Sequence, residues 1–337
     1  MKIAFFEIER WEEPILKEQL RGHELFFSAR PLGKSDLKKV KDFDILSVFI
    51  YSYLKKEMLS SFTKLKLITT RSTGFDHIDT EECKKRKIAV ANVPTYGENT
   101  VAEHTFALLL ALSRKIIESV GRTRRGNFDL EGLRGFDLKG KTLGVIGCGN
   151  IGRHVVRIAK GFEMNVLVFD VKPDTAFAKL HGFRYVPMNN LLAESDIVTL
   201  HAPLNTHTFH LLNAKNMKLL KKGVLLINTA RGGLIETDAL VQALKKKHLA
   251  GVALDVLEEE CEIREERQLL SSHFKQHTAN KCDIQVALEN HILLAQDNVI
   301  ITPHNAFNSN EALMRILETD LANIRGFLKK DKLNLVN

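Results

Sequence analysis

The strongest constraint on the fold is the stretch GVIGCGNIGRHVVRIAKGFEMNVLVFD, residues 144–170. Three of its glycines have the spacing G-x-G-x-x-G: Gly147, Gly149 and Gly152. An apolar run that suits a strand (142–146) precedes them, and a helical segment (153–160) and a second apolar run (166–169) follow. The acid Asp170 ends the stretch, 18 positions after the last glycine. Three glycines at this spacing also occur by chance, but in this context they predict a phosphate-binding turn.

Each residue of the turn has a physical reason. Gly147 permits a tight turn, Gly149 leaves room for a pyrophosphate against the backbone, and Gly152 lets the helix pack on the strand. Free N–H groups and the helix dipole then favour the negative charge. Asp170 can accept hydrogen bonds from both ribose hydroxyls of NAD, whereas the 2′-phosphate of NADP would cost on the order of 1–4 kcal/mol beside it. The turn therefore predicts NAD, with Lys172 able to weaken the discrimination; the alternative is a glycine turn without a ligand.

Short apolar runs alternate with helical stretches along the whole chain, a pattern typical of α/β folds built on doubly wound parallel sheets. The length of 337 residues suggests two domains. Before the glycine turn the expected strands are 3–6, 45–50, 67–70 and 90–93. After it they are 166–169, 197–200, 224–227, 252–254 and 299–301.

Several segments between these strands have a distinct character. Residues 100–117 predict one long helix, apolar nearly all round, of the kind buried between domains or subunits. Residues 121–140 predict a connection over the surface. Thr237 and Asp238 offer a helix N-cap, and a final helix is expected around 311–328. Residues 258–297 are charge-rich at first and helical later, which indicates an insertion between the last two strands.

Composition and charge exclude several classes of protein. Apolar residues are 44% and charged residues 27%, which is ordinary for a globular protein and argues against disorder. No apolar run approaches 18 residues, so no membrane span is expected. Glu7 and Glu9 stand where a signal peptide needs apolar residues, so a cytoplasmic location is expected.

The net charge of +8 raises the question of nucleic-acid binding. The cationic runs at 84–87, 122–125 and 245–247 lie beside acids or at expected helix ends, and aromatic residues do not interleave them. Solvated helix faces are therefore favoured over a nucleic-acid surface, and the charge would favour small anionic substrates. The four cysteines form no CxxC pair, which predicts reduced thiols and no metal site: Cys83, Cys148, Cys261 and Cys282.

Three polar residues follow later strands, where open α/β sheets bind their ligands. Arg231 lies in NTARGG, Glu260 ends LDVLEEE, and His304 lies in ITPHNAF. Taken singly, each has an ordinary alternative interpretation: Arg231 as a surface charge, Glu260 as a solvated acid and His304 as a structural histidine. Beside an NAD turn they fit the reduction of a 2-keto acid: Arg231 would bind the substrate, His304 would protonate the forming alkoxide, and Glu260 would raise the histidine pKa.

At this point the chain resembles the D-isomer-specific 2-hydroxyacid dehydrogenases. The residues that carry the resemblance extend over most of the chain: STGFDHID, VPTYGENTVAEHT, LGVIGCGNIG, NTARGG, ALDVLEEE and TPHNAF. The resemblance implies two Rossmann-like domains with the active site in the cleft between them. Residues 1–100 and 302–337 would form a flavodoxin-like substrate domain, and residues 101–301 an inserted NAD-binding domain. It also implies a homodimer built on the NAD-binding domain.

The resemblance further implies roles for individual residues. Arg231, Glu260 and His304 would be catalytic, Asp255 would hold the nicotinamide carboxamide, and the backbone of Thr73 and Gly74 would bind the substrate carboxylate. The cofactor-binding residues implied are Gly147, Gly149, Asn150, Ile151, Gly152, Asp170, His201, Pro203, Thr229, Ala230, Arg231 and Asp255.

Within the family the resemblance is closest to the D-lactate dehydrogenases. Tyr96, Phe307 and the interval of 44 residues from Glu260 to His304 point there. Phe307 would form an apolar wall beside a small substrate side chain, or be an ordinary core residue. Tyr96, and less specifically Tyr51, would line the same pocket.

Other readings stay open. Gly97-Glu98 and Asn308 depart from the pattern common in lactate-type members, which leaves glyoxylate, hydroxypyruvate or longer 2-keto acids as alternative substrates. The family also resembles corepressors with the same fold, so a non-enzymatic NAD-sensing module is a remote alternative.

Overall fold

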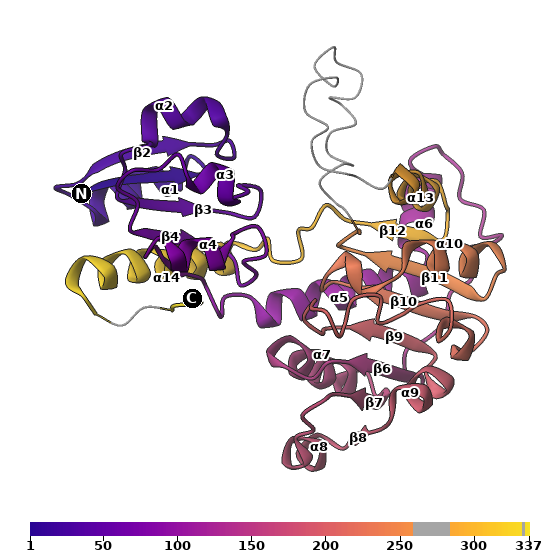
Figure 1. Cartoon of the computed structure of the whole chain (residues 1–337). Helices are drawn as coiled ribbons and strands as arrows, with labels where there is room; N and C mark the ends of the chain where they lie inside the picture. Colours follow the sequence, from indigo (N-terminus) through magenta and orange to yellow (C-terminus); the bar gives the residue numbers. More distant parts are fainter. Residues whose placement is uncertain (259–283, 332–333) are drawn as a thin grey trace. The chain divides into compact units, whose positions relative to one another are not determined.

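A computed structural model describes residues 1–258, 284–331 and 334–337. It divides into two compact units, each with its own sheet (Figure 1). Unit 1 comprises Met1–Gly97 and Asn308–Asn337, and unit 2 comprises Glu98–Phe307. The chain thus leaves unit 1, forms unit 2 and returns, with crossings at 97/98 and 307/308. The crossings expected from the sequence were at 100/101 and 301/302.

Unit 1 contains five strands in the order β2-β1-β3-β4-β5, and every pair is parallel. The strands are β1 (Lys2–Phe6), β2 (Glu24–Ser28), β3 (Ile45–Val48), β4 (Leu67–Thr70) and β5 (Ala89–Ala91). The chain runs from β1 outward to β2 and then crosses to β3 on the other side of β1. The switch in winding direction therefore lies between β1 and β3, the place where open α/β sheets form a ligand crevice.

Helices cover both faces of this sheet because successive strand residues point to opposite sides. Helices α1 (Glu12–Gln19) and α14 (Asn310–Lys329) pack on Ile3 and Phe5. On the other side Ala4 and Phe6 contact residues carried by α2 (Leu37–Val40), α3 (Lys56–Leu59) and α4 (Thr80–Lys85). The short helix η1 (Lys34–Asp36) precedes α2. The last residues of the chain return along β5, where Leu335 pairs with Ala91.

Unit 2 contains seven parallel strands in the order β12-β11-β10-β9-β6-β7-β8. They are β6 (Thr142–Ile146), β7 (Asn165–Phe169), β8 (Arg184–Tyr185), β9 (Ile197–Leu200), β10 (Val224–Asn228), β11 (Leu249–Leu254) and β12 (Val299–Ile301). The winding direction switches between β6 and β9. This is the doubly wound arrangement that binds dinucleotides at the switch, and it confirms the predicted fold class.

Two layers of helices complete unit 2. One layer contains α5 (Glu98–Ser113) and α7 (Asn150–Gly161), and the other contains α9 (Met188–Glu194), α10 (Thr237–Lys245) and α13 (Ile284–Leu294). The other helices among the described residues of unit 2 are short: α6 (Ile116–Thr123), α8 (Thr175–His181), η2 (Met217–Leu219) and η3 (Gly232–Leu234). Helix α13 lies within the predicted insertion, of which residues 259–283 are outside the described part.

The single helix predicted for 100–117 is wrong at its end. Helix α5 stops at Ser113, and Lys115 takes a left-handed conformation (φ 52°) before α6 begins. The cause is distant in sequence: the Ser113 carbonyl accepts a hydrogen bond from the Phe136 amide (3.0 Å), and Gly135 packs so closely that a Cβ there would lie 2.2 Å from the same oxygen. The returning chain therefore caps the helix, and Ile116 and Ile117 belong to a different, exposed helix.

The N-cap predicted at Thr237 and Asp238 is also wrong. Helix α10 begins at Thr237 itself, with Glu236 at the N-cap and without a capping side chain. The Thr237 hydroxyl donates instead to the Glu258 carboxylate (2.6 Å).

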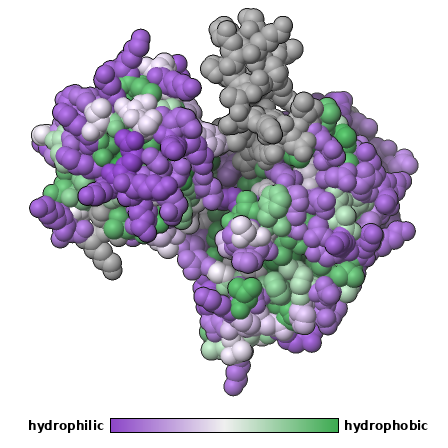
Figure 2. Space-filling model, viewed as in Figure 1, coloured by the Kyte–Doolittle hydropathy of each residue, from purple (hydrophilic) through white to green (hydrophobic). Residues whose placement is uncertain are grey.

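The two units differ on their surfaces. Figure 2 shows hydrophilic residues over most of the visible surface of unit 1 and hydrophobic residues gathered on the visible face of unit 2. Within unit 2, α6 and the chain after it expose large apolar side chains, among them Ile117 (58%), Phe128 (77%) and Leu130 (80%). In the described part of the chain no helix is both long and apolar enough to cross a membrane.

Candidate active site

The glycine turn lies at the switch between β6 and β9. Gly147 has a φ of +93°, and a Cβ on it would lie 2.7 Å from the His201 carbonyl group. A Cβ on Gly152 would lie 2.2 Å from the Gly147 oxygen. Gly149 is different, because no atom lies within 4 Å of its Cβ position. The fold itself thus requires Gly147 and Gly152, whereas the open space at Gly149 fits a ligand that approaches the backbone.

Helix α7 begins directly behind this space. Gly149 is its N-cap and supplies no side-chain acceptor, so the first amides of the helix can serve an anion. Asn150 is exposed, with its amide nitrogen 3.5 Å from the Glu98 carboxylate. Ile151 packs against the core of unit 2, so its side chain has a structural role.

Asp170 is held at the end of β7 by two backbone amides. One carboxylate oxygen accepts from the Cys148 amide (2.6 Å) and the other from the Lys172 amide (2.8 Å). Each oxygen keeps a lone pair, so the fixed carboxylate can still accept from two hydroxyls. Lys172 contacts Asp170 through its backbone.

His201 faces the glycine turn from the end of β9. Its amide donates to the Ile146 carbonyl (2.7 Å), and its Nε2 lies 2.9 Å from the Thr199 hydroxyl. Its Nδ1 is buried and has no hydrogen-bond partner among the described residues. Burial lowers the pKa of His201 to about 3, so the ring is neutral at pH 7. Pro203, two residues on, is exposed, and its carbonyl accepts from Thr208.

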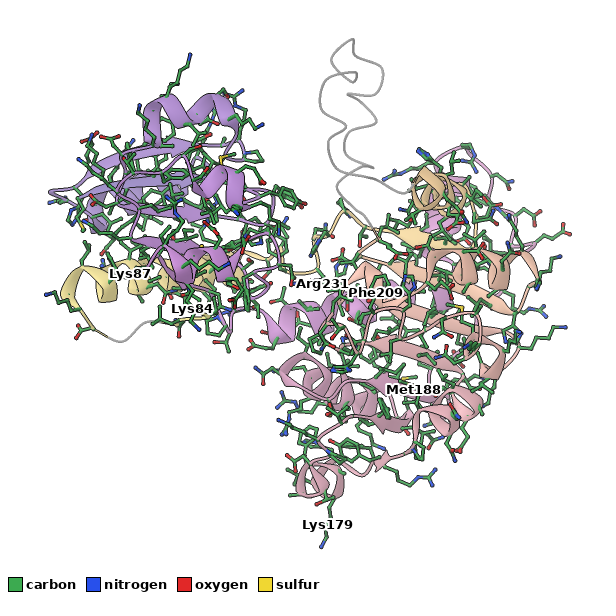
Figure 3. All side chains as sticks on the ribbon, viewed as in Figure 1. Lys84, Lys87, Lys179, Met188, Phe209 and Arg231 are labelled. Atoms are coloured by element: carbon green, nitrogen blue, oxygen red, sulfur yellow. The ribbon has the colours of Figure 1, made fainter. Side chains whose placement is uncertain are left out.

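Asn228 shapes the loop that carries Arg231. Its buried side-chain amide accepts from the Ala230 nitrogen (3.0 Å) and donates to the Arg231 carbonyl (2.8 Å). Thr229 is fixed from the side, because its hydroxyl bonds that of Thr105 on α5 (2.9 Å). Arg231 is half-buried and its guanidinium donates to the Ala230 carbonyl (2.8 Å). Figure 3 shows Arg231 on this loop beyond β10.

Backbone hydrogen bonds join the ends of β10, β11 and β12. The Asp255 amide donates to the Asn228 carbonyl, and the His304 amide donates to the Asp255 carbonyl, both at 2.9 Å. The loops that carry Arg231 and His304 are therefore held on either side of one residue, Asp255. His304 adopts a left-handed conformation (φ 51°), which costs a residue other than glycine on the order of 1–2 kcal/mol.

The Asp255 carboxylate stabilises that conformation. It is 1% exposed and accepts from the amides of Asn305 (3.0 Å) and Ala306 (2.8 Å) and from the Thr302 hydroxyl. His104 Nε2 on α5 lies 3.5 Å away. Burial alone would raise the pKa of Asp255. The hydrogen bonds from His104, Thr302 and the two amides lower it by more, so the net pKa lies below its ordinary value. The structure thus gives Asp255 the task of forming the His304 turn, and its predicted contact with the carboxamide stays a prediction.

Glu260 lies outside the described residues, but the chain approaching it is described. Gly232 touches this chain so closely that a Cβ would lie 2.0 Å from the Leu257 carbonyl carbon. Glu258 is anchored by the Thr237 hydroxyl and by His210 Nε2 (2.7 Å). The chain leading to Glu260 therefore starts beside the loop of Arg231.

The remaining candidates divide between the units. In unit 1, Thr73 and Gly74 follow β4, and their amides have no acceptor among the described residues, so they can donate to a carboxylate. The turn is fixed by hydrogen bonds from the Thr73 hydroxyl to the Val93 carbonyl (2.9 Å) and from the Ser72 hydroxyl to Gly74 (2.6 Å). Tyr96, also in unit 1, is half-buried, and its carbonyl accepts from Arg315. Phe307 is the last residue of unit 2 and is half-buried.

Sequence reasoning missed three residues of this site. His104 reaches the Asp255 carboxylate, Asn228 forms the Arg231 loop, and Gly232 admits the chain toward Glu260. His104 lies in AEHT, and Asn228 and Gly232 lie in NTARGG, but neither motif indicates what these side chains contact. Among residues 1–258, 284–331 and 334–337 no group of three His, Cys, Asp or Glu side chains is arranged to hold a metal. Cys83 and Cys148 are buried free thiols whose pKa burial raises, and Cys261 and Cys282 lie outside the described residues.

Comparison with known proteins places this geometry in context. Residues 106–306 match the model of the D-isomer specific 2-hydroxyacid dehydrogenase NAD binding domain. The D-lactate dehydrogenase of Escherichia coli is 35% identical over 98% of this chain and 97% of that protein. The glyoxylate reductase of Thermococcus litoralis is 34% identical over 99% and 91%. The solved structure of D-lactate dehydrogenase from Aquifex aeolicus complexed with NAD and lactic acid has a TM-score of 0.85 and 37% identity, covering 98% of this chain and 96% of that one.

Proposed function

Because the chain belongs to the family of D-isomer-specific 2-hydroxyacid dehydrogenases, which are NAD-dependent oxidoreductases, we propose that it is a D-lactate dehydrogenase that reduces pyruvate to D-lactate. The observation that carries the activity is the joining of β10, β11 and β12, which holds the loops of Arg231 and His304 around Asp255. The substrate is supported by the similarity to a D-lactate dehydrogenase solved with NAD and lactic acid.

The residues of unit 2 divide the chemistry between them. NADH, when bound, supplies the hydride that reduces the keto carbon. The glycine turn, the first amides of α7 and Asp170 hold the cofactor, and Arg231 binds the carboxylate and the carbonyl oxygen of the substrate. His304 donates its proton to the oxygen of the former carbonyl as negative charge develops there. Glu260 is the acid that we propose as the partner of His304.

The proposed contacts that orient the substrate come from Thr73, Gly74 and Tyr96 of unit 1 and from Phe307, the last residue of unit 2. The amides of Thr73 and Gly74 donate to the substrate carboxylate. Tyr96 and Phe307 border the substrate side chain, and an apolar wall of this kind favours a methyl group over a hydroxymethyl group. Discrimination of this type between small substituents is modest, about 10–200-fold.

The experiment that tests this function is NADH oxidation at 340 nm with pyruvate, glyoxylate, hydroxypyruvate and a longer 2-keto acid in parallel. Chiral analysis of the product follows. The expected result is the highest kcat/KM for pyruvate, with D-lactate as the product. Formation of L-lactate, or a kcat/KM for pyruvate below those of the other 2-keto acids, would contradict the proposal. Tight NADH binding without turnover of any 2-keto acid would favour the NAD-sensing module.

A second candidate substrate has its own support. A relative named glyoxylate reductase covers nearly the whole chain, and Gly97-Glu98 and Asn308 stand beside Tyr96 and Phe307. A kcat/KM for glyoxylate or hydroxypyruvate above that for pyruvate would keep the mechanism and change the substrate.

We also propose a homodimer built on unit 2. The exposed apolar residues of α6 and of the chain after it form one candidate surface: Ile116, Ile117, Val120, Phe128 and Leu130. Exposed apolar patches of this kind commonly mark interfaces. Light scattering after gel filtration should give a mass near 76 kDa, about twice that of the 38.1 kDa chain. The variant Ile117→Lys should shift the protein toward the monomer, and a monomeric wild type would exclude the dimer.

A further inference from the structure

The switch point of unit 1, between β1 and β3, holds an acidic side chain of the protein itself. Glu7 is the first residue after β1, with a left-handed backbone (φ 58°). Its carboxylate accepts from the amides of Phe49 (3.1 Å) and Tyr51 (2.9 Å) and from the Ser52 hydroxyl, all in the loop that follows β3. One carboxylate therefore takes three donors of a loop that lies where such sheets bind their ligands.

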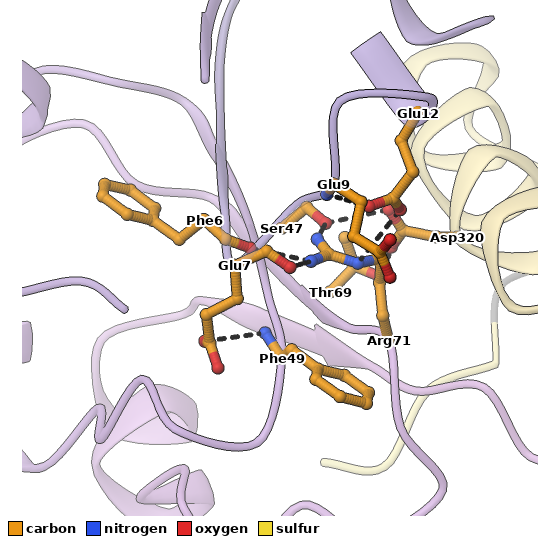
Figure 4. Close-up of polar contacts among 9 residues, drawn as sticks. All are labelled: Phe6, Glu7, Glu9, Glu12, Ser47, Phe49, Thr69, Arg71 and Asp320. Carbon is orange, nitrogen blue, oxygen red and sulfur yellow. Dashed lines mark hydrogen bonds and ion pairs between the residues drawn. The ribbon is translucent and has the colours of Figure 1, made fainter. Parts of the chain in front are cut away.

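Glu7 is itself held by a buried arginine. Arg71, 3% exposed, donates from one guanidinium nitrogen to the carbonyls of Phe6 and Glu7, both at 2.7 Å. Its other terminal nitrogen donates to the Ser47 hydroxyl (2.8 Å), and its Nε lies 3.8 Å from Glu12 (Figure 4). The backbone at Glu7 is thus locked, so its side chain reaches the loop from a rigid base.

The loop of residues 49–52 lies beside the predicted substrate contacts. Strands β3 and β4 are neighbours, with Val48 opposite Thr70, and the Arg71 amide donates to the Val48 carbonyl (2.9 Å). The two residues after Ser72 are Thr73 and Gly74, whose amides we assign to the substrate carboxylate. Ser52 is fully buried and also accepts from the Leu32 amide (3.0 Å), so the far end of the loop is anchored as well.

From this geometry we propose that Glu7 is a positioning residue for the substrate. It holds the loop of residues 49–52, and with it Tyr51, beside the turn whose Thr73 and Gly74 amides we assign to the substrate carboxylate. This inference rests on the proposed function, because it takes unit 1 as the substrate-binding unit. Glu7 acts through this loop and not through contact with the reacting atoms.

The test compares Glu7→Gln with Glu57→Gln, the same change at an exposed acid of the same unit. Glutamine keeps the size of the side chain but replaces one acceptor oxygen by a donor, which faces the loop donors. We expect the KM for the preferred 2-keto acid to rise about 5- to 20-fold with kcat within about threefold, because loosened substrate contacts weaken binding. The NADH dissociation constant, a property of unit 2, should stay within about twofold of the wild type.

Hydrogen exchange gives a readout that needs no catalysis. The amides of Phe49 and Tyr51 should exchange faster in Glu7→Gln than in the wild type. In Glu57→Gln their exchange rates should equal those of the wild type. If Glu7→Gln fails to fold, Ser52→Ala removes one of the three donors while the carboxylate stays, and a smaller rise in KM is then expected.

The outcomes separate the inference from the proposed function. A KM of Glu7→Gln within twofold of that of Glu57→Gln overturns the role of Glu7. Turnover by the wild type would in that case still support the proposed function. Unchanged exchange at Phe49 and Tyr51 also overturns it. If the wild type reduces no 2-keto acid at all, both the proposed function and the substrate role of Glu7 fall.

Discussion

Units 1 and 2 have the same kind of parallel sheet, but they treat the switch point in opposite ways. In unit 2 glycine leaves the space open, and the first turn of α7 has no side chain at its N-cap. In unit 1 the Glu7 carboxylate takes the available amides of the β3 loop. The amides at the switch point of unit 1 are therefore taken by an anion of the protein itself, whereas the first amides of α7 in unit 2 stay available for an anionic ligand.

The same contrast extends into the interior. Unit 1 buries Arg71 with Glu12 and Asp320 near it, and Asp320 accepts from the hydroxyls of Ser47 (2.8 Å) and Thr69 (2.7 Å). In unit 2 one such set of buried polar contacts lies at the strand ends, around Asp255. Unit 1 therefore uses buried polar contacts for rigidity, and unit 2 uses them to shape loops for a ligand.

The largest effect is expected at His304. If unit 2 carries the proton transfer, His304→Ala should lower kcat about 10²- to 10⁴-fold while NADH binding is retained. Stopped-flow NADH binding and steady-state rates measure both. The control is His207→Ala, an exposed histidine of the same unit. Near-wild-type turnover in His304→Ala would remove this residue from the mechanism.

The buried arginine of unit 1 should be the most sensitive position for stability. Arg71→Met leaves Glu12 and Asp320 without their buried cation, and it should lower the free energy of unfolding by about 3–5 kcal/mol. Burial already raises the pKa of both acids. Urea unfolding of this variant and of the exposed control Arg10→Met measures the difference. A loss as small as that of the control would show that the cluster does not stabilise unit 1.

Two glycines of unit 2 separate folding from ligand binding. Gly149→Ala meets no atom of the protein, so stability should change little while NADH affinity falls about tenfold or more, or about 1.4 kcal/mol. Gly152→Ala would collide with the Gly147 carbonyl and should destabilise unit 2 by about 1–3 kcal/mol. Calorimetric titration with NADH and thermal unfolding distinguish the two. Equal NADH affinity in Gly149→Ala and the wild type would contradict the open-space assignment.

The smallest effect is a pH dependence at His201. Its folded pKa of about 3 lies below its unfolded value near 6.5, so protons bind the unfolded chain first. Its contribution to stability is present above pH 6.5 and is lost as the pH falls toward 3. Relative to His201→Gln, the wild type should lose about 1.5 kcal/mol between pH 6.5 and 5. Urea unfolding measures the free energy of unfolding of both proteins at each pH. If this free energy changes with pH in the same way in the wild type and in His201→Gln, His201 is not a buried neutral imidazole.

Much of the fold was predictable because the central strands are buried on both faces and therefore consist of uninterrupted apolar runs. The predicted runs at 67–70 and 197–200 are strands in the structure with the same bounds. The run predicted for 45–50 ends early, at Val48, because the Phe49 and Tyr51 amides turn toward Glu7. The edge strands β2 and β8 were missed, since their residues are partly exposed or too few to form a pattern.

The candidate site was predictable where a short motif carries its own chemistry. The glycine turn with Asp170, and Arg231 and His304 after strands, could be found in the linear sequence. Glu7 could not: in the sequence it is only a charge near the N-terminus. His104 was missed for the same reason, because its partner Asp255 lies far along the chain. Asn228 was missed although its partners Ala230 and Arg231 are close in sequence, because a side chain that shapes a loop carries no chemical signature in the sequence.

The α/β class, the NAD turn and the family could be inferred from the amino-acid sequence, because each is carried by apolar runs or short motifs whose residues are neighbours in the chain. The end of α5, the role of Asp255 in the His304 turn and the place of Glu7 at the switch point of unit 1 became visible in the folded chain. Those features arise from hydrogen bonds between segments separated by tens of residues. Their geometry exists only once the sheets have assembled, and no local pattern of residues encodes it.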